Sequence, residues 1–193
     1  PRIVGDTDCL VAPIVDWRAI TRHARLMLCF GGIPLRNGQI INGGGGQHDM
    51  GPWLRAADDN GVRLVNISPV RDDMPGDVSA EWVPIIPGTD TAMMLAMAHV
   101  LIQDGSTDAD FLARCAIGYD GLRDYVLGVS DGVPKTPTWA AAETGVPAET
   151  IVRLAREMAS TPTFLAAAWS VQRSEYGEQP YWMLIALSAM IGS

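Results

Sequence analysis

Two short apolar runs, each followed at once by a polar loop, constrain the fold of this chain more than any other feature. The runs are Val62–Ile67 and Trp82–Ile86, within the stretch of residues 61–90. Both are rich in β-branched residues and stop at polar residues with Pro or Gly, which is typical of buried parallel strands. Pro84 suits an edge strand or a bulge, because proline has no N–H for a central ladder. The stretch therefore predicts two parallel strands with a loop at the carboxyl end of each.

The rest of the chain continues the alternation of strands and helices. Leu26–Phe30 and Thr163–Trp169 have the same apolar pattern ending in a loop. A helix is predicted over Asp49–Asn60, and a buried helix over Thr91–Gln103. Because parallel strands need crossover connections, the pattern predicts an α/β fold. We expect a single domain over residues 1–193, with a Rossmann-like, mainly parallel sheet, helices on both faces and a helical insertion at about residues 104–160.

Composition and charge exclude several classes of function. The net charge of −8 and the pI of about 4.7 argue against nucleic-acid binding through phosphates. Charged residues make up only 19% of the chain, which leads to the hypothesis that much of its surface faces other protein. The first residues lack the features of a signal peptide, and no apolar window reaches the ~18 to 20 residues of a membrane span. We therefore expect a soluble protein; its compartment, periplasm or cytoplasm, stays open, because any export signal would lie outside this stretch of sequence.

No motif indicates a metal site or a self-contained catalytic set. The three cysteines include no C-x-x-C pair and are too few for a four-cysteine zinc or iron–sulfur site, so we predict buried or half-buried structural thiols. The glycine run Gly43–Gly46 lacks the spacing of a dinucleotide fingerprint and predicts a surface loop. No serine has the context of a nucleophile elbow. The scattered histidines are predicted to be structural; they are His23, His48 and His99.

The loops that follow the four predicted strands are the candidate site. Ligands of open α/β sheets bind outside the carboxyl ends of the strands, and backbone N–H groups and a helix N-terminus there suit phosphates. Asp72 or Asp90 is predicted to accept from guanine or ribose, Arg71 or Arg173 to hold phosphate, and Gln172 to meet a heterocycle edge. The alternative is that Asp90 is an ordinary helix N-cap and Asp72 a solvated loop acid. The loops are Gly31–Pro34, Ser68–Asp72, Gly88–Asp90 and Trp169–Arg173.

Four stretches of the sequence resemble a known enzyme family. They are LVNISPVRDD, EWVPIIPGTDTAMMLAMAHVLI, GVSDGVPKTPTWAAAETGVPAETI and AAAWSVQRSEYGEQPYWMLIALSAMIG. Together they resemble the dimethyl-sulfoxide reductase family of molybdenum enzymes, with the trimethylamine-N-oxide and biotin-sulfoxide reductases as the nearest look-alikes. The resemblance runs from about Leu26 to Gly192. It implies a cofactor of two molybdopterin guanine dinucleotides around one molybdenum, and reduction of S-oxides or N-oxides by oxygen-atom transfer.

The resemblance also implies roles for residues in each loop. The loop after Ile67 is expected to meet the guanosine end of one dinucleotide, the loop before the helix at Thr91 to form its second wall, and the loop after Thr163–Trp169 to approach the pterin or its phosphates. The glycine loop is expected near the cofactor. The implied cofactor-binding residues are Gly31, Gly32, Pro34, Ser68, Pro69, Val70, Arg71, Asp72, Gly88, Thr89, Asp90, Trp169, Ser170, Gln172 and Arg173.

The match to the family is incomplete in one respect. In the resembled enzymes the molybdenum ligand, a serine in this subgroup, lies upstream of the matched region, and the main domain for the second dinucleotide lies downstream. The chain therefore resembles an internal domain of a longer enzyme, whose remaining domains would be its partners. No catalytic or metal-binding residue is predicted within it, and the isolated chain is expected to lack bound cofactor and activity.

Two other functions stay open from the sequence alone. A nicotinamide-binding domain predicts a glycine fingerprint after the first strand and an acid about 20 residues on, whereas the sequence has Gly31-Gly32-Ile33-Pro34 there. A non-catalytic interaction module predicts a conspicuous apolar surface and no nucleotide binding.

Overall fold

The fold is built on one parallel sheet. The structure, a computed structural model, describes residues 16–38 and 48–192. Its four-stranded sheet has the order β3-β2-β1-β4, and all three neighbouring pairs are parallel. This confirms the predicted α/β class and places all four predicted strands in one sheet. The strands are β1 Leu26–Phe30, β2 Arg63–Ile67, β3 Ala80–Val83 and β4 Thr163–Ala167.

Three of the four strands differ from the prediction in their bounds. β2 begins at Arg63, one residue later than expected, and β3 begins at Ala80, two residues earlier. The third strand was expected over Trp82–Ile86, but β3 ends at Val83, because Pro84 has no N–H to continue the ladder. The following Ile86 N–H instead donates to the Thr144 carbonyl at 2.9 Å. The fourth strand ends at Ala167, two residues earlier than expected, and the chain turns into a short 3₁₀ helix, η2 Trp169–Gln172.

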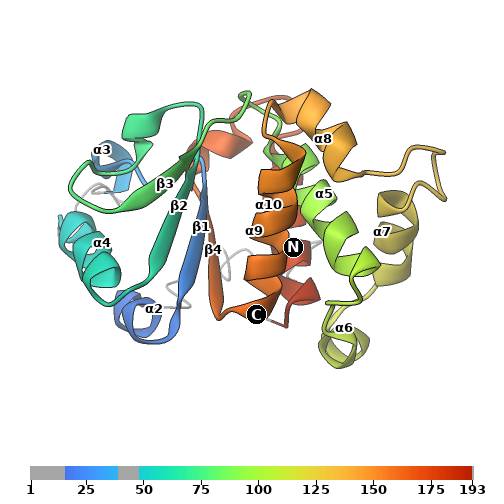
Figure 1. Ribbon diagram of the computed structural model, residues 1–193, viewed down its shortest axis with the longest axis horizontal. Coiled ribbons are helices and arrows are strands. Elements are labelled where there is room, and N and C mark those ends of the chain that lie inside the picture. Colours follow the sequence, from blue (N-terminus) through green and yellow to red (C-terminus); the bar gives the residue numbers. More distant parts are fainter. Residues whose placement is uncertain (1–15, 39–47, 193) are drawn as a thin grey trace.

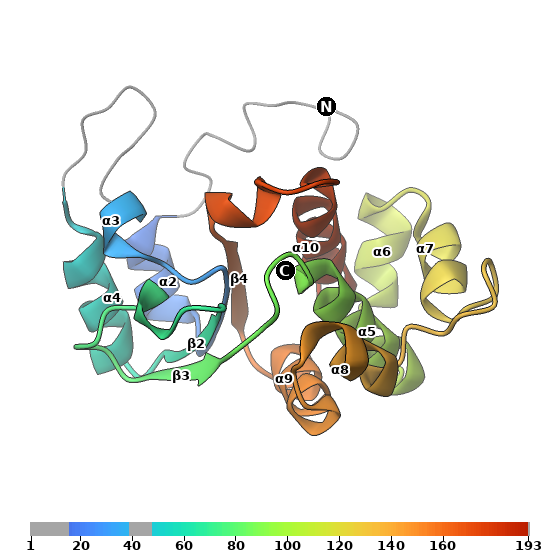
Figure 2. The same ribbon diagram turned by 90° about the horizontal axis from the view of Figure 1, so that it is seen from above.

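Helices cover both faces of the sheet (Figure 1 and, seen from above, Figure 2). Three helices lie on one side: α2 Trp17–His23, α3 Leu35–Gly38 and α4 Met50–Asp59. The layer on the other side contains α5 Asp90–Gln103, α9 Ala148–Ser160 and α10 Glu178–Met190. Beyond this layer lie α6 Ala109–Cys115, α7 Tyr119–Val126 and α8 Pro137–Thr144, which form the outlying part of the predicted insertion.

The core is divided into two apolar clusters, one on each face of the sheet. The larger cluster joins the sheet to α5, whose residues from Met93 to Leu101 are buried except His99. The same cluster contains Ile151 and Leu154 of α9. The last part of the predicted helical insertion, which includes α9, therefore belongs to the helix layer that covers this face of the sheet. The smaller cluster packs α2 and α4 on the opposite face. Each fully buried large aliphatic side chain stabilises the fold by about 1.5–3 kcal/mol relative to an exposed one. Burial on both faces therefore holds the sheet in place beneath the loops that follow its strands.

A charge network links the sheet to α9. Arg63 on β2 forms ion pairs with both Glu81 on β3 and Glu157 on α9, and Arg153 also pairs with Glu81. We expect Arg63→Met to lower the free energy of unfolding by about 1 kcal/mol. This is more than the loss of a single exposed ion pair would cost, because several charges here form one network. Urea unfolding in low and high salt measures this, and the loss should shrink at high salt.

The matched control is Arg55→Met. Arg55 forms a single ion pair with Asp77 at 2.7 Å, and both side chains are about half exposed. Its replacement should change the free energy of unfolding by a few tenths of a kcal/mol at most. Equal losses of stability in the two variants would show that the network around Arg63 stabilises the fold no more than a single exposed ion pair does.

Candidate nucleotide-binding site

All four strand-end loops lie at the same edge of the sheet, at the top of Figure 1. Three of them are joined directly by backbone hydrogen bonds. The Gly31 N–H donates to the Ile67 carbonyl at 2.8 Å, and the Ala168 N–H donates to the Phe30 carbonyl at 2.8 Å. The Ser68 N–H donates at 3.2 Å to the carbonyl of Val83, the last residue of β3. The predicted loops are therefore neighbours in space.

The glycine loop after β1 is too crowded for any other residue. Gly31 and Gly32 have φ values of +78° and +69°, in the region that favours glycine. A Cβ on Gly32 would lie 2.4 Å from the Asp73 carbonyl oxygen, and one on Gly31 would lie 2.9 Å from Val171 Cγ1. Pro34 follows and is buried. The two glycines therefore let the loops after β2 and β4 close onto β1.

The loop after β2 turns its serine inward. Ser68 is fully buried, and its hydroxyl donates to Asp73 Oδ2 at 2.6 Å and accepts from the Val70 N–H at 3.2 Å. The remaining predicted residues, Pro69, Val70, Arg71 and Asp72, are exposed at the sheet edge. Ser68 is thus placed beneath the predicted site and does not face it directly.

Two buried polar residues of this loop region were not predicted. Asp73 accepts from Ser68 and pairs with Arg36, while its backbone carbonyl accepts from the Ile33 N–H at 2.6 Å. Asn66 on β2 donates from Nδ2 to the Arg71 carbonyl at 2.9 Å. Its Oδ1 is buried without a hydrogen-bond partner among the residues that the structure describes. Asn66 could have been noticed as a polar residue inside an apolar strand run. Nothing in the sequence distinguishes Asp73 from its neighbour Asp72.

The start of α5 corrects the capping interpretation of Asp90. Thr89 occupies the N-cap position, but its hydroxyl donates to the Ile86 carbonyl at 2.7 Å and does not cap the helix. Asp90 is the first residue of α5, and only 5% of it is exposed. Burial raises the pKa of the Asp90 carboxyl above its usual value, and a hydrogen bond from its own N–H opposes this. Gly88, with φ +81°, is exposed beside it.

The loop after β4 supplies an aromatic ring and a free cation. Trp169 is 56% exposed, and its ring lies 6.1 Å from that of Tyr181 between centroids. Ser170, Gln172 and Arg173 are also exposed. Within residues 16–38 and 48–192, neither Arg173 nor Arg71 has a carboxylate at ion-pair distance. The edge therefore combines two guanidinium groups without carboxylate partners among the described residues, an exposed indole and the nearly buried acid Asp90.

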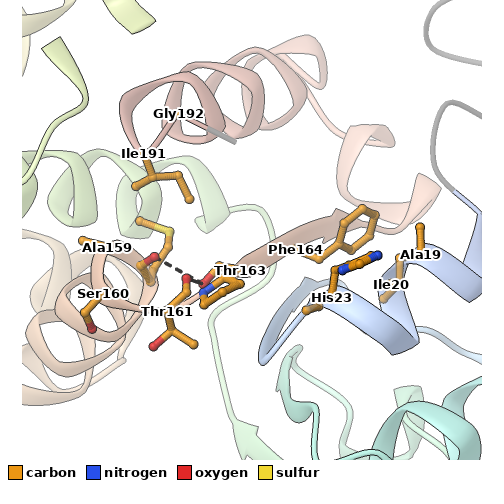
Figure 3. A pocket seen from close by; sticks show the side chains of 13 residues that line it. Ala19, Ile20, His23, Ala159, Ser160, Thr161, Thr163, Phe164, Ile191 and Gly192 are labelled. Atoms are coloured by element: carbon orange, nitrogen blue, oxygen red, sulfur yellow. Dashed lines mark hydrogen bonds between the residues drawn. The ribbon is translucent and has the colours of Figure 1, made fainter. Parts of the chain in front are cut away.

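A separate pocket lies at the opposite end of β4 (Figure 3). It has a volume of about 540 Å³ and is lined by the end of α2 and the α9–β4 connection, including His23, Ser160 and Thr163. Figure 3 shows Thr163 turned toward the end of α9, where its hydroxyl contacts the Met158 and Thr161 carbonyls at 3.2 and 2.8 Å. Among the described residues that line it, His23 is the only His, Cys, Lys, Arg, Asp or Glu. This pocket lies away from the carboxyl ends of the strands, so it is not part of the candidate site.

The structure also bears on the predictions for individual residue types. In the described part of the chain, no three His, Cys, Asp or Glu residues are close enough to hold a metal ion. None of the helices described there is long and apolar enough to cross a membrane. Cys29 is buried, and burial raises its pKa to about 12, as expected for a structural thiol. Cys115 is exposed at the end of α6, which corrects the prediction of burial. Cys9 and Gly43–Gly46 lie outside the described residues.

Comparison with known proteins decides the family. The sequence profile described as molybdopterin oxidoreductase matches residues 19–193. The chain belongs to the molybdopterin oxidoreductase family. Membership implies a molybdopterin cofactor, and the relatives described next confirm the resemblance to sulfoxide and N-oxide reductases.

Relatives within this family share the sequence at moderate identity. A biotin sulfoxide reductase of Cereibacter sphaeroides is 42% identical over 90% of this chain and 23% of that protein. A trimethylamine-N-oxide reductase of Haemophilus influenzae is 36% identical over 100% of this chain and 23% of that protein. The chain therefore spans about a quarter of the length of these molybdopterin oxidoreductases.

A solved structure supports the fold independently. Acetylene hydratase from Pelobacter acetylenicus superposes with a TM-score of 0.71 at 22% identity, over 90% of this chain and 22% of that one. At this level of identity the likeness concerns the fold alone. The strand-end loops of this molybdopterin oxidoreductase domain therefore belong to a fold that is also found in a solved structure.

Proposed function

We propose that this chain binds the guanosine end of a molybdopterin guanine dinucleotide within an S-oxide or N-oxide reductase. The observation that carries the proposal is Asp90, a nearly buried carboxylate at the loop edge. Among the described residues it accepts only from its own N–H. Guanine presents two neighbouring N–H donors, which would satisfy such a carboxylate and favour its charged form.

Other groups at the edge fit the rest of the nucleotide. Arg71 and Arg173 are exposed cations that have no carboxylate partner in the described part of the chain, which suits a diphosphate. The N–H groups at the start of α5 carry the positive end of the helix dipole. The exposed Trp169 ring offers a surface for stacking. The residues present therefore fit the phosphate and base of such a cofactor.

The division of labour within the whole enzyme follows from this placement. Molybdenum, when bound, supplies the oxygen-atom transfer, and the residues of this chain bind and orient the nucleotide. S-oxides or N-oxides would be the substrates, as the names of the relatives indicate. The exposed apolar side chains on α7, on α10 and in the α6–α7 connection, including Tyr125, Trp182 and Ile117, support contacts with further parts of a longer polypeptide.

A nucleotide titration tests the proposal. We expect the 193-residue chain to bind GDP, and to bind GMP more weakly because one phosphate is missing. ADP and NAD should bind more weakly than GDP, because adenine presents an acceptor where guanine presents a ring N–H. Calorimetry at fixed ionic strength measures all four. Equal affinity for ADP and GDP would remove the role of guanine recognition, and preference for NAD would favour a nicotinamide-binding domain.

The coding sequence around this chain provides a second test. A longer reductase of this kind requires a serine-bearing metal-ligand region upstream. A flanking sequence without such a region would contradict the proposed activity, although the nucleotide titration would still stand by itself.

A further inference from the structure

We propose that Asp73 is a positioning residue for nucleotide binding, and that Ser68 acts only through it. The inference rests on the proposed function and goes beyond the residues predicted for the site. Asp73 lies in the short 3₁₀ helix η1 Arg71–Asp73, directly beneath the exposed loop after β2. Only 8% of Asp73 is exposed.

Asp73 connects two loops that carry candidate binding groups. One carboxylate oxygen accepts from the Ser68 hydroxyl at 2.6 Å, and the other forms the ion pair with Arg36 on α3. Its backbone carbonyl accepts from Ile33 at 2.6 Å, in the glycine loop after β1. Asp73 therefore contacts the loop after β1, the helix that follows it and the loop after β2 at once.

The contacts of Ser68 continue this connection to the exposed edge. Its hydroxyl has a single hydrogen, which is donated to Asp73, while its oxygen accepts from the Val70 N–H. Because Ser68 has no exposed surface, a nucleotide at the edge would meet Val70 and Arg71 and would not reach the hydroxyl. The hydroxyl thus transmits the position of Asp73 to the loop that bears Arg71.

The close approach of Gly32 supplies the third contact. There is no room for a Cβ between Gly32 and Asp73, since it would lie 2.4 Å from the Asp73 carbonyl oxygen and 2.6 Å from its Cβ. A shift of Asp73 would therefore move the glycine loop as well. Loss of the carboxylate should loosen both loops without disturbing the strands beneath them.

The test compares Asp73→Asn with Asp77→Asn. Asparagine keeps the shape but cannot accept from both Ser68 and Arg36. Asp77 lies four residues on, is exposed and pairs with Arg55 at 2.7 Å, so its replacement makes the same charge change outside the site. We expect GDP to bind Asp73→Asn about tenfold more weakly, as for loss of a charge-assisted hydrogen bond, and to bind Asp77→Asn normally.

Amide hydrogen exchange of the nucleotide-free chain gives a readout independent of the ligand. The Ile33 and Val70 amides should exchange about tenfold faster in Asp73→Asn, while Leu28 and Val65 in the core strands stay protected. Unchanged exchange at Ile33 and Val70 would overturn the proposal, and so would faster exchange with unchanged GDP affinity. If the parent chain does not bind GDP, the proposed function fails, and exchange still decides whether Asp73 holds the loops.

A double variant decides whether Ser68 touches the nucleotide itself. If Ser68 acts through Asp73, Ser68→Ala should weaken GDP binding in the parent chain and add nothing in the Asp73→Asn background. Additive losses would assign Ser68 a direct contact and overturn this part of the proposal.

Discussion

Gly32→Ala should destabilise the chain by about 3–5 kcal/mol, the sum of a left-handed backbone cost and severe overpacking. Gly32 has φ +69°, which costs an alanine about 1–2 kcal/mol. The added methyl would also lie 2.4 Å from the Asp73 carbonyl oxygen and 2.8 Å from Asn66 Oδ1. Neither neighbour can easily move away, because one is a backbone oxygen of η1 and the other belongs to the buried Asn66 amide on β2, which is held by its hydrogen bond to the Arg71 carbonyl. Chemical unfolding followed by circular dichroism measures the loss.

Gly61→Ala is the matched control for this substitution. Gly61 has nearly the same backbone conformation, with φ +77°, but a Cβ there would meet no atom within 4 Å. Alanine at this position should therefore cost only the backbone term of about 1–2 kcal/mol. A similar loss of stability in the two variants would show that the loops relax around the added methyl at Gly32. The close approach of the loops after β1 and β2 would then not contribute to the cost of the substitution.

The sequence allowed the frame of this fold to be predicted because the frame depends on local patterns. Leu26–Phe30 was predicted with its exact bounds, since a five-residue apolar run between charged and glycine residues leaves little choice. The third strand was misplaced because its apolar residues continue past Pro84, while the ladder cannot. Ile85 stays buried without being in the strand, so apolar character and strand pairing separate at this point.

The inner structure of the site could not be predicted in the same way. Asp72 and Asp73 are adjacent and chemically identical, and which of them faces inward depends on the turn of η1 beneath the sheet edge. That turn is fixed by contacts with Gly32, Ile33 and Arg36, which lie almost forty residues away in the sequence. The inward turn of the Ser68 side chain could not be predicted for the same reason, because its partner Asp73 was not recognised.

Asp90→Asn should weaken GDP binding by at least about tenfold while making the nucleotide-free chain more stable at neutral pH. The loss of affinity corresponds to one charge-assisted hydrogen bond of about 1.5–3 kcal/mol. The gain in stability follows from burial, which raises the pKa of Asp90 in the folded chain. A pure capping residue would behave differently, since asparagine caps helices about as well as aspartate.

The pH dependence gives the sign of the effect on stability. A raised folded-state pKa means that the folded chain holds the proton more tightly than the unfolded chain does. The free energy of unfolding therefore falls as pH rises from the ordinary aspartate pKa of 3.8 through the raised value. Asp90→Asn removes this loss, so the stability difference between variant and parent should be largest at neutral pH and smallest near pH 4. Arg156 and Lys135 lower the pKa values of Asp104 and Asp131, respectively. The resulting loss of stability in acid is the same in the variant and the parent chain, so it cancels in the difference between them.

The control for Asp90 is an acid in the first turn of another helix, where it is exposed. Asp110 lies in the first turn of α6, is exposed, and is remote from the sheet edge. Asp110→Asn should leave GDP affinity unchanged and slightly lower stability at neutral pH, because a carboxylate near a helix N-terminus is favourable by about 0.3–1 kcal/mol. The two variants are thus expected to change stability in opposite directions. If Asp90→Asn retains GDP affinity, or is destabilised like Asp110→Asn, then its carboxylate is an ordinary helix-start acid and the guanine contact must be sought elsewhere on this edge.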